Sequence, residues 1–283
     1  MMNAQSGSSK KLTAALYFIL FFVTLLVVFP LIWTILLSFK TNSEILTTPF
    51  SLPKTFSFEN YTRAFETLNL FGLYKNTLII AFFAISIELV ITFMSGFALS
   101  KMIFKNPALK KFIYTFLIIG LTIPPFILLF PIFKMTAFFK LQGTYAAIIL
   151  PYIATSISFN TLLFTGYLSS LPKEIDEAAL IDGCDLYKLC TRIIIPMAKP
   201  VIATILVFNV LYIWNEFPLA STLITDPAKH TISLGASYFK GRWNVDYTGI
   251  MASSVMIIIP QLLFYGFFQR YIVDGMTAGA VKG

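Results

Sequence analysis

The chain has 283 residues, of which 57% are hydrophobic and 12% are charged, with a mean hydropathy of +0.80 and a formal net charge of +8. Soluble domains have roughly 45–50% apolar and about 25% charged residues, so this composition excludes an ordinary water-soluble fold. The basic excess is spread along the chain, and anchoring to anionic lipid headgroups explains it better than binding of nucleic acid. The chain is therefore predicted to be a membrane protein.

Six apolar runs are near or above the ~20 residues that a helix needs to cross ~30 Å of hydrocarbon. They cover about residues 12–39, 77–100, 112–133, 143–168, 201–224 and 250–268. The runs lack the alternation of a strand, so helices with internally paired backbones are expected rather than a barrel. The predicted fold is an all-α membrane protein with six transmembrane helices, in a single transmembrane domain over residues 12–283 that follows a short segment, 1–11.

Basic residues in short loops predict the orientation, because such loops stay on the cytoplasmic side. These lysines precede the first run or lie between the second and third: Lys10, Lys11, Lys101, Lys105, Lys110 and Lys111. Both ends of the chain are then cytoplasmic, with the segment 172–200 and the tail 270–283. The segments 40–75 and 225–247 are expected outside.

The segment 172–200 is charged and amphipathic, unlike the apolar runs on either side. Pro172 and three acids within residues 174–177 favour the start of a helix, where acidic groups complement the dipole. Gly183 permits a sharp turn that a residue with a Cβ would resist. Apolar residues recur at helical spacing beyond it, and Pro196 is expected to end that run. Two short helices at an angle are predicted.

Catalytic and cofactor-binding motifs are lacking. The sequence has no phosphate-binding glycine loop, no H-E-x-x-H and no G-x-S-x-G. Cys184 and Cys190 have no further ligands at metal-binding spacing and are interpreted as packing residues. We therefore expect no enzyme activity, metal or cofactor in this chain, and any energy from ATP has to enter through another polypeptide.

The segment 172–200 resembles the EAA loop of ABC-transporter permease subunits. The residues that carry this resemblance are Glu177, Ala178, Ala179, Gly183, Ile193, Ile195 and Pro196. The run Trp214–Phe217 and the closing run Gln269–Gly283 are similar to the carbohydrate-uptake branch, in particular its maltose-type small permease. Cys184 and Ile195 depart from the usual alanine and leucine, without a large change in volume or polarity.

This resemblance implies a type I ABC importer permease fold, in the inner or plasma membrane of a bacterium, with cytoplasmic coupling helices. It implies ATP-driven, binding-protein-dependent uptake of a sugar or oligosaccharide. The implied partners are a second homologous permease chain in a heterodimer, two ATPase subunits that bind ATP and Mg, and an extracellular or periplasmic solute-binding protein.

By the same resemblance, one group of residues is expected to couple to the ATPase: Glu177, Ala178, Ala179, Asp182, Gly183, Ile193, Ile195 and Pro196. The tail residues Gly279, Ala280, Val281, Lys282 and Gly283 are expected to reach the ATPase as well. The alternative for the segment is an amphipathic helix lying on lipid headgroups. Its acidic start favours coupling, because lipid-binding faces are usually basic.

Polar residues inside the apolar runs are costly and are candidates for the substrate pathway. The candidates in the fifth run are Asn209, Tyr212, Trp214, Asn215 and Glu216, whose amides, carboxylate and rings suit sugar hydroxyls and ring faces. The alternative is hydrogen bonding between helices, which we favour for Glu88 and Gln261. A secondary transporter or channel is a rival function, but it would need paired intramembrane ionisable residues, and Glu88 and Glu216 are far apart in the sequence.

Overall fold

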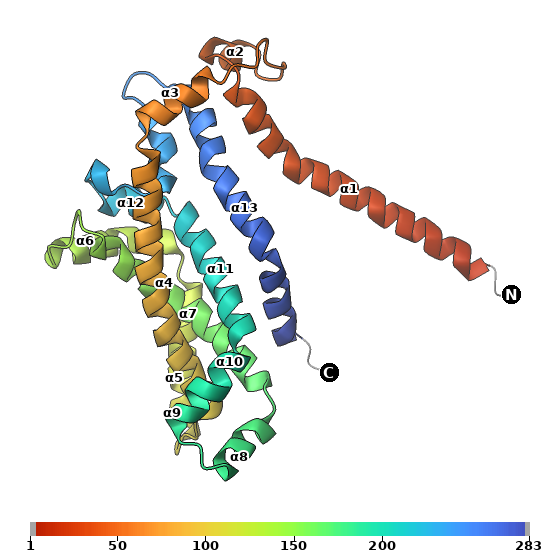
Figure 1. The fold of residues 1–283 in the computed structure, drawn as a ribbon, viewed down its shortest axis with the longest axis vertical. Coiled ribbons are helices and arrows are strands. Elements are labelled where there is room, and N and C mark those ends of the chain that lie inside the picture. Colours follow the sequence, from red (N-terminus) through yellow and green to blue (C-terminus); the bar gives the residue numbers. More distant parts are fainter. Residues whose placement is uncertain (1–3, 281–283) are drawn as a thin grey trace. The chain divides into compact units, whose positions relative to one another are not determined.

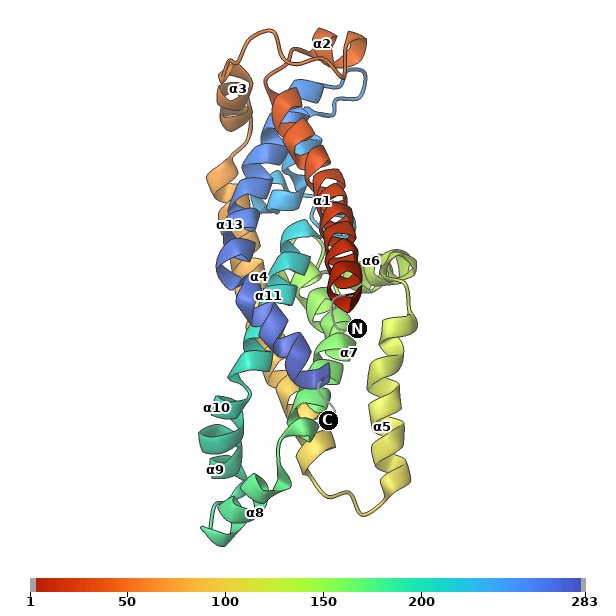
Figure 2. The same cartoon turned by 90° about the vertical axis from the view of Figure 1, so that its right-hand side faces the viewer.

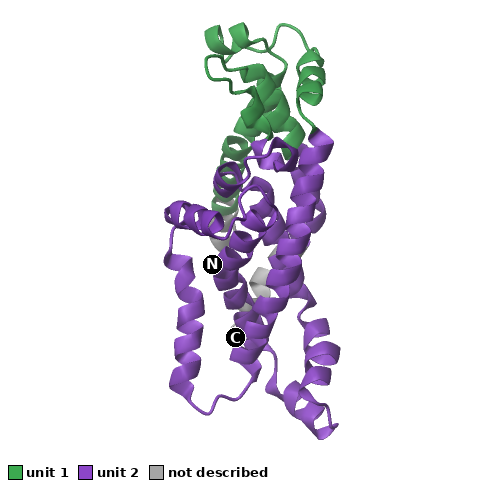
Figure 3. Ribbon diagram, turned by 90° about the vertical axis from the view of Figure 1, so that its left-hand side faces the viewer, with its two compact units in different colours: residues 1–69, 235–258 green, residues 70–234, 259–283 purple. Residues whose placement is uncertain are grey.

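The computed structural model describes residues 4–280, with side chains from residue 12 to residue 270. The described chain is helical, and its only extended pairing is an isolated bridge between Lys240 and Val245. The all-α prediction is therefore confirmed. The chain divides into two compact units, residues 1–69 with 235–258 and residues 70–234 with 259–283 (Figure 3).

The first unit contains α1 (Ala4–Ser38), α2 (Asn42–Thr47), α3 (Glu59–Thr67) and the start of α13 (Tyr247–Ala280). Helix α2 begins with a capping box, in which the Thr41 hydroxyl accepts from the Glu44 N–H and the Glu44 carboxylate accepts from the Thr41 N–H. The apolar segment Leu12–Ser38 of α1 buries none of its most hydrophobic stretch within the described chain. It is therefore suited to contact with lipid or another chain.

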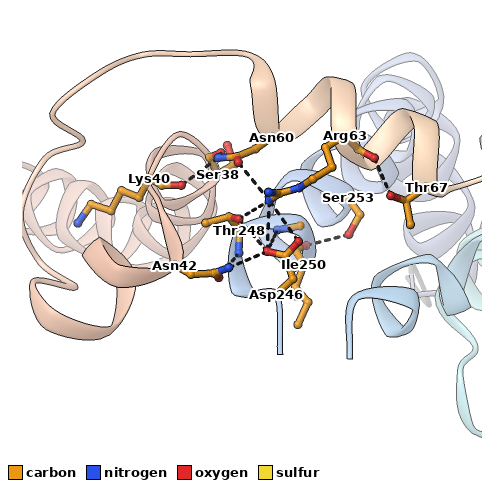
Figure 4. A network of polar contacts seen from close by, with 11 residues as sticks. Ser38, Lys40, Asn42, Asn60, Arg63, Thr67, Asp246, Thr248, Ile250 and Ser253 are labelled. Carbon is orange, nitrogen blue, oxygen red and sulfur yellow. Dashed lines mark hydrogen bonds and ion pairs between the residues drawn. The ribbon is translucent and has the colours of Figure 1, made fainter. Parts of the chain in front are cut away.

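A polar network holds the first unit together (Figure 4). The carboxylate of Asp246 accepts from the Asn42 amide at 3.1 Å and pairs with Arg63 at 3.1 Å, and Arg63 also donates to the Thr248 hydroxyl at 2.7 Å. Hydrogen bonds from Gly249, Thr248 and Asn42 and the charge of Arg63 outweigh the opposing effect of burial and lower the pKa of Asp246. The network ties α2 and α3 to the first turn of α13.

Three long helices form the centre of the second unit (Figure 1). They are α4 (Leu70–Lys101), α7 (Ala146–Ser170) and α11 (Lys199–Asn215). Helices α4 and α7 approach closely at Gly96, where an added Cβ would lie 2.5 Å from the Cβ of Phe164. Helix α5 (Pro107–Ile119) packs on α7. The absence of a side chain at Gly96 is thus what permits α4 and α7 to approach closely at this point.

Two apolar clusters fill the second unit. One contains Ile80, Ala84 and Ile148, and the other contains Phe93 and Phe164. Buried polar side chains lie along the helices between and beside these clusters: Glu88, Thr92, Ser158, Asn160, Thr161 and Asn209. The interior of the bundle therefore consists of two apolar clusters, with buried polar side chains along the helices between and beside them.

The third predicted run, 112–133, is broken rather than straight. Helix α5 continues into η1 (Gly120–Thr122), and after Pro124 the chain resumes as η2 (Pro125–Leu128) and α6 (Leu129–Phe138), bent by 93°. The adjacent prolines remove two backbone donors, which prevents a continuous helix. The run is thus a bent pair of helices and not one straight helix.

The fifth predicted run, 201–224, is shorter in the structure, since α11 ends at Asn215. Glu216 is extended, with φ −71° and ψ 112°, and a separate short helix, α12 (Pro218–Leu223), follows. Pro218 lacks the N–H that would continue the helix, so the run cannot remain straight. The prediction of an unbroken fifth helix was wrong for this reason.

Four helical segments are long and apolar enough to cross a membrane: Leu12–Ser38, Leu70–Lys101, Ala146–Ser170 and Tyr247–Arg270. The number rises to six if each bent pair among the described residues is one span. The predicted tail from residue 270 is helical as far as Ala280, because α13 continues through it.

Short 3-10 helices, η4 (Pro227–Lys229) and η5 (Ile232–Phe239), follow α12. The loop around η4 is fixed to the first turns of α4. The Asn76 amide donates to the carbonyls of Ala228 and His230, both at 2.9 Å, and the Thr77 hydroxyl accepts from the Ile232 N–H at 2.9 Å. The loop is consequently held by buried side chains of α4.

Candidate functional site

Residues 172–200 form an elbow at one end of the second unit (Figure 2). Its first arm is α8 (Lys173–Ile181), which starts after Pro172 and has Glu174 and Asp176 in its first turn. Gly183 has a φ of +72°, the Cys184 N–H donates to the Ala179 carbonyl at 2.9 Å, and the Gly183 N–H donates to the Leu180 carbonyl at 3.1 Å. This is a Schellman motif, and it ends the helix where the sequence predicts.

The second arm contains α9 (Leu186–Lys188), a π-helical turn η3 (Leu189–Ile194) and α10 (Ile195–Met197). The Asp185 carboxylate accepts from the Lys188 N–H at 2.7 Å, and this hydrogen bond lowers the pKa of Asp185. The arm continues past Pro196 to Met197 and then bends by 69° into α11. The run thus ends one residue beyond Pro196, close to where the sequence predicts, and the π-helical turn η3 before it accommodates the N–H that the proline lacks.

One face of the elbow is buried against the bundle. Ala179, Leu189, Ile194 and Ala198 belong to the same apolar cluster as Phe93 of α4 and further residues of α7 and α11. A displacement of the elbow therefore has to be accommodated by the ends of all three central helices, since close-packed interiors transmit strain.

The opposite face of the elbow is exposed, and we call it the docking face. It combines acidic, small and apolar side chains: Glu177, Ala178, Leu180, Ile181, Asp182, Leu186 and Tyr187. Ile181 is 86% exposed and Tyr187 is 76% exposed. Of the other predicted coupling residues, Ala179 is buried, Ile193 and Ile195 are half-buried, and Gly183 and Pro196 are exposed.

Sequence reasoning missed the apolar part of this face. The helical spacing of the apolar residues beyond Gly183 predicts one stripe that includes Leu186 and Leu189, but Leu186 is exposed and Leu189 is buried. The available signal was the pair Leu180–Ile181, which follows two alanines directly and precedes the turn at Gly183. Large exposed apolar side chains that have acidic residues around them indicate a protein interface.

The predicted pathway residues divide into two groups. Asn209 is buried, and its amide donates to the Asn160 side-chain oxygen of α7 at 3.2 Å. Glu216 is also buried. Its carboxylate accepts from the N–H groups of Leu219 and Ala220, at 2.6 and 3.0 Å, and from the Tyr152 hydroxyl at 2.7 Å. These two side chains join helices to one another, as in the alternative interpretation of the sequence.

Tyr212 and Asn215 line a cavity of about 490 Å³ near the end of α11. Its other lining residues are Pro125, Phe126, Leu129, Phe208, Leu211, Glu216, Pro218 and Leu219. Trp214 instead packs against Tyr74, with ring centroids 5.7 Å apart. The aromatic members Phe126 and Phe208 were not predicted, because they come from other turns and from the broken third run.

The predicted tail contacts fall at the end of the described chain. Gly279 and Ala280 belong to the helical backbone of α13, whereas Val281, Lys282 and Gly283 lie outside the described residues. No group of three metal-binding side chains occurs among the residues that the structure describes.

Fold and site together define a multi-pass helical membrane protein with an exposed amphipathic elbow at one end of its bundle. The chain belongs to the family of binding-protein-dependent transport system inner membrane components, whose family model matches residues 89–278. It is thus a membrane transport component and not an enzyme.

Relatives match almost the whole chain. It is 32% identical to the diacetylchitobiose uptake system permease protein NgcG of Streptomyces coelicolor, over 100% of this chain and 93% of that protein. It is also 32% identical to the trehalose/maltose transport system permease protein MalG of Thermococcus litoralis, over 92% and 94% of the two chains. A subunit of a bacterial ABC transporter involved in alginate import has the same fold, with a TM-score of 0.77 at 22% identity over 93% of this chain and 97% of that chain.

Proposed function

We propose that this chain is a transmembrane permease subunit of an ATP-driven importer for a sugar or oligosaccharide, and that its elbow receives the force of ATP hydrolysis. The observation that carries the proposal is the docking face, an uncovered acidic and apolar surface on an elbow seated on three central helices. The diacetylchitobiose and trehalose/maltose systems of the two relatives support a carbohydrate substrate.

The proposed topology has six spans with both ends of the chain in the cytoplasm. Each bent helix pair then counts as one span. The lysines at the end of α4 and the start of α5 support a cytoplasmic position for this end of the second unit. The elbow follows α7 and so lies on the same side, where ATP is available.

The proposed assembly contains a second, homologous permease chain in a heterodimer. Two ATPase subunits bind ATP and Mg on the cytoplasmic side, and a solute-binding protein delivers the substrate on the other side. A separate ATPase is required because this sequence has no phosphate-binding loop. The tail, Gly279–Gly283, extends toward the ATPase subunits.

In the proposed mechanism, closure of the ATPase dimer displaces the elbow. Glu177 pairs with a basic residue of the ATPase, Ala178 permits close approach, and Ile181 enters an apolar recess. The buried face of the elbow is packed with α4, α7 and α11, so the displacement reaches α11, whose far end lines the cavity. Alternating access then follows from rigid-body movement of packed elements.

The proposed pathway passes the cavity at the end of α11. Phe126, Phe208 and Tyr212 offer ring faces for stacking on sugars, and the Asn215 amide offers donors and an acceptor for hydroxyls. Asn209 and Glu216 keep this wall in place through their bonds to Asn160 and Tyr152. Trp214 supports the wall from behind through Tyr74.

Substitution on the docking face tests the coupling role. Ile181→Asp in the complete transporter should leave membrane insertion unchanged but abolish co-purification of the ATPase subunits and uptake of labelled maltose, trehalose or diacetylchitobiose. The matched control is Ile103→Asp, because Ile103 is an equally exposed isoleucine at the end of α4 and lies outside the docking face. Normal ATPase binding and uptake by Ile181→Asp would contradict the proposal.

A further inference from the structure

A partly buried ion pair joins the elbow to the end of α4. The Lys101 ammonium lies 2.8 Å from the Asp176 carboxylate, and the two side chains are 6% and 22% exposed. Lys101 is in the last turn of α4, where a positive charge complements the helix dipole, and Asp176 is in the first turn of α8, where a negative charge does the same. Both helix ends therefore favour the pair.

Its environment separates this pair from the other ion pairs of the described residues, whose side chains are 27–61% exposed. The second carboxylate oxygen of Asp176 is buried without a hydrogen-bond partner in the described chain, so Lys101 alone balances this carboxylate. Removal of either partner leaves an uncompensated charge in a poorly hydrated position, which is far more costly than the loss of a surface pair.

The ion pair connects the elbow to α4, a helix to which the backbone does not join it directly. The elbow is joined covalently to α7 at one end and to α11 at the other, but it has no covalent link to α4. We propose that Lys101 and Asp176 are positioning residues that lock α8 to α4, so that α4 moves with the elbow during the transport cycle. This inference rests on the proposed function of the elbow.

The other end of α4 is bonded to a loop on the opposite side of the second unit. Asn76 and Thr77 hold the loop of residues 228–232 through buried hydrogen bonds. The helix between these residues and Lys101 is unbroken and spans about 36 Å at 1.5 Å per residue. Helix α4 therefore acts as a lever between the docking face and this loop, which in the proposed topology faces the solute-binding protein.

Spin labels test the lock in the complete transporter. Labels are placed through Ile103→Cys beside the end of α4 and Glu174→Cys, an exposed position of α8 outside the docking face, in a Cys184→Ala, Cys190→Ala background. The distance between them is measured without nucleotide and with trapped ATP. We expect one narrow distance that is the same in both states. Asp176→Asn or Lys101→Met should broaden this distance and shift it between the two states. They should also lower the labelled sugar transported per ATP hydrolysed by at least about fivefold.

The double variant Lys101→Met with Asp176→Asn leaves neither charge unpaired, so it decides the matter if a single variant fails to fold, and it should show the same broadened distance and lowered transport ratio. Lys101→Arg keeps the charge at the end of α4 and should retain both parental values. Lys105→Met is the matched control, because it removes the same charge from the same loop at an exposed position. An unchanged distance in Asp176→Asn with the ATPase bound would overturn the proposed link between α8 and α4 but not the proposed function of the elbow. Failure of the ATPase subunits to co-purify with the parent chain, with its Ile181 intact, would overturn the proposed function.

Discussion

The buried carboxylate of Glu216 provides a quantitative test of how the cavity wall is held. Its two oxygens accept three donors: the Leu219 N–H on one oxygen, and the Ala220 N–H and the Tyr152 hydroxyl on the other. In Glu216→Gln only one oxygen remains. Its best orientation keeps the Ala220 and Tyr152 bonds and turns the amide NH₂ toward the Leu219 N–H.

One buried donor is then left without an acceptor, which costs about 2 kcal/mol. For 283 residues, at about 2.1 cal/mol/K of unfolding entropy per residue, that corresponds to a fall in Tm of about 3 °C. Glu216→Ala leaves all three donors unpaired, and at the same cost per donor the loss is about 6 kcal/mol, enough to prevent assembly.

Thermal unfolding of the purified transporter in detergent, followed by tryptophan fluorescence, measures this loss. Asn215→Ala is the matched control for stability, because Asn215 is exposed and its amide donates within its own helix, to the Leu211 carbonyl. That change should alter stability by less than about 0.5 kcal/mol. A parental Tm for Glu216→Gln, combined with altered apparent affinity for sugar, would show that Glu216 contacts substrate instead of holding α12.

Three further substitutions test other parts of the structure. Gly96→Ala should force α4 and α7 apart and destabilise the bundle by about 1–3 kcal/mol, whereas Gly166→Ala, where a Cβ meets nothing within 4 Å, should have little effect; thermal unfolding compares them. Gly183→Val should strain the turn between the arms by about 1–2 kcal/mol, since φ is +72°, and reduce uptake more than Gly183→Asn does. Asp246 has a pKa below its unfolded value of about 3.9, so its network should stabilise the first unit fully above that pH and progressively less as pH falls through the folded value. Unfolding followed between pH 7 and pH 3 should show this loss in the parent and not in Asp246→Asn; identical pH profiles would contradict the assignment.

The sequence alone determined the features that depend on local chemistry. Apolar runs identified an all-helical membrane protein, because backbones in hydrocarbon must be paired internally. The elbow was predictable because Pro172 and Gly183 act on their own neighbours, through φ preference and capping. The break at Pro124 and Pro125 was predictable for the same reason, although its angle of 93° was not.

The tertiary structure decided which distant groups meet. Hydropathy gives the length of an apolar run but not the path of the chain within it. It could therefore not show that the helix in the fifth run stops at Asn215, or that the Glu216 carboxylate accepts a hydrogen bond from the first turn of α12. Tyr152 and Glu216 are 64 residues apart, and Lys101 and Asp176 are 75 residues apart. The residues next to a side chain in the sequence do not indicate a partner that only tertiary packing brings close. For that reason the hydrogen bonds that hold the cavity wall and the ion pair between α4 and α8 could be found only in the folded structure.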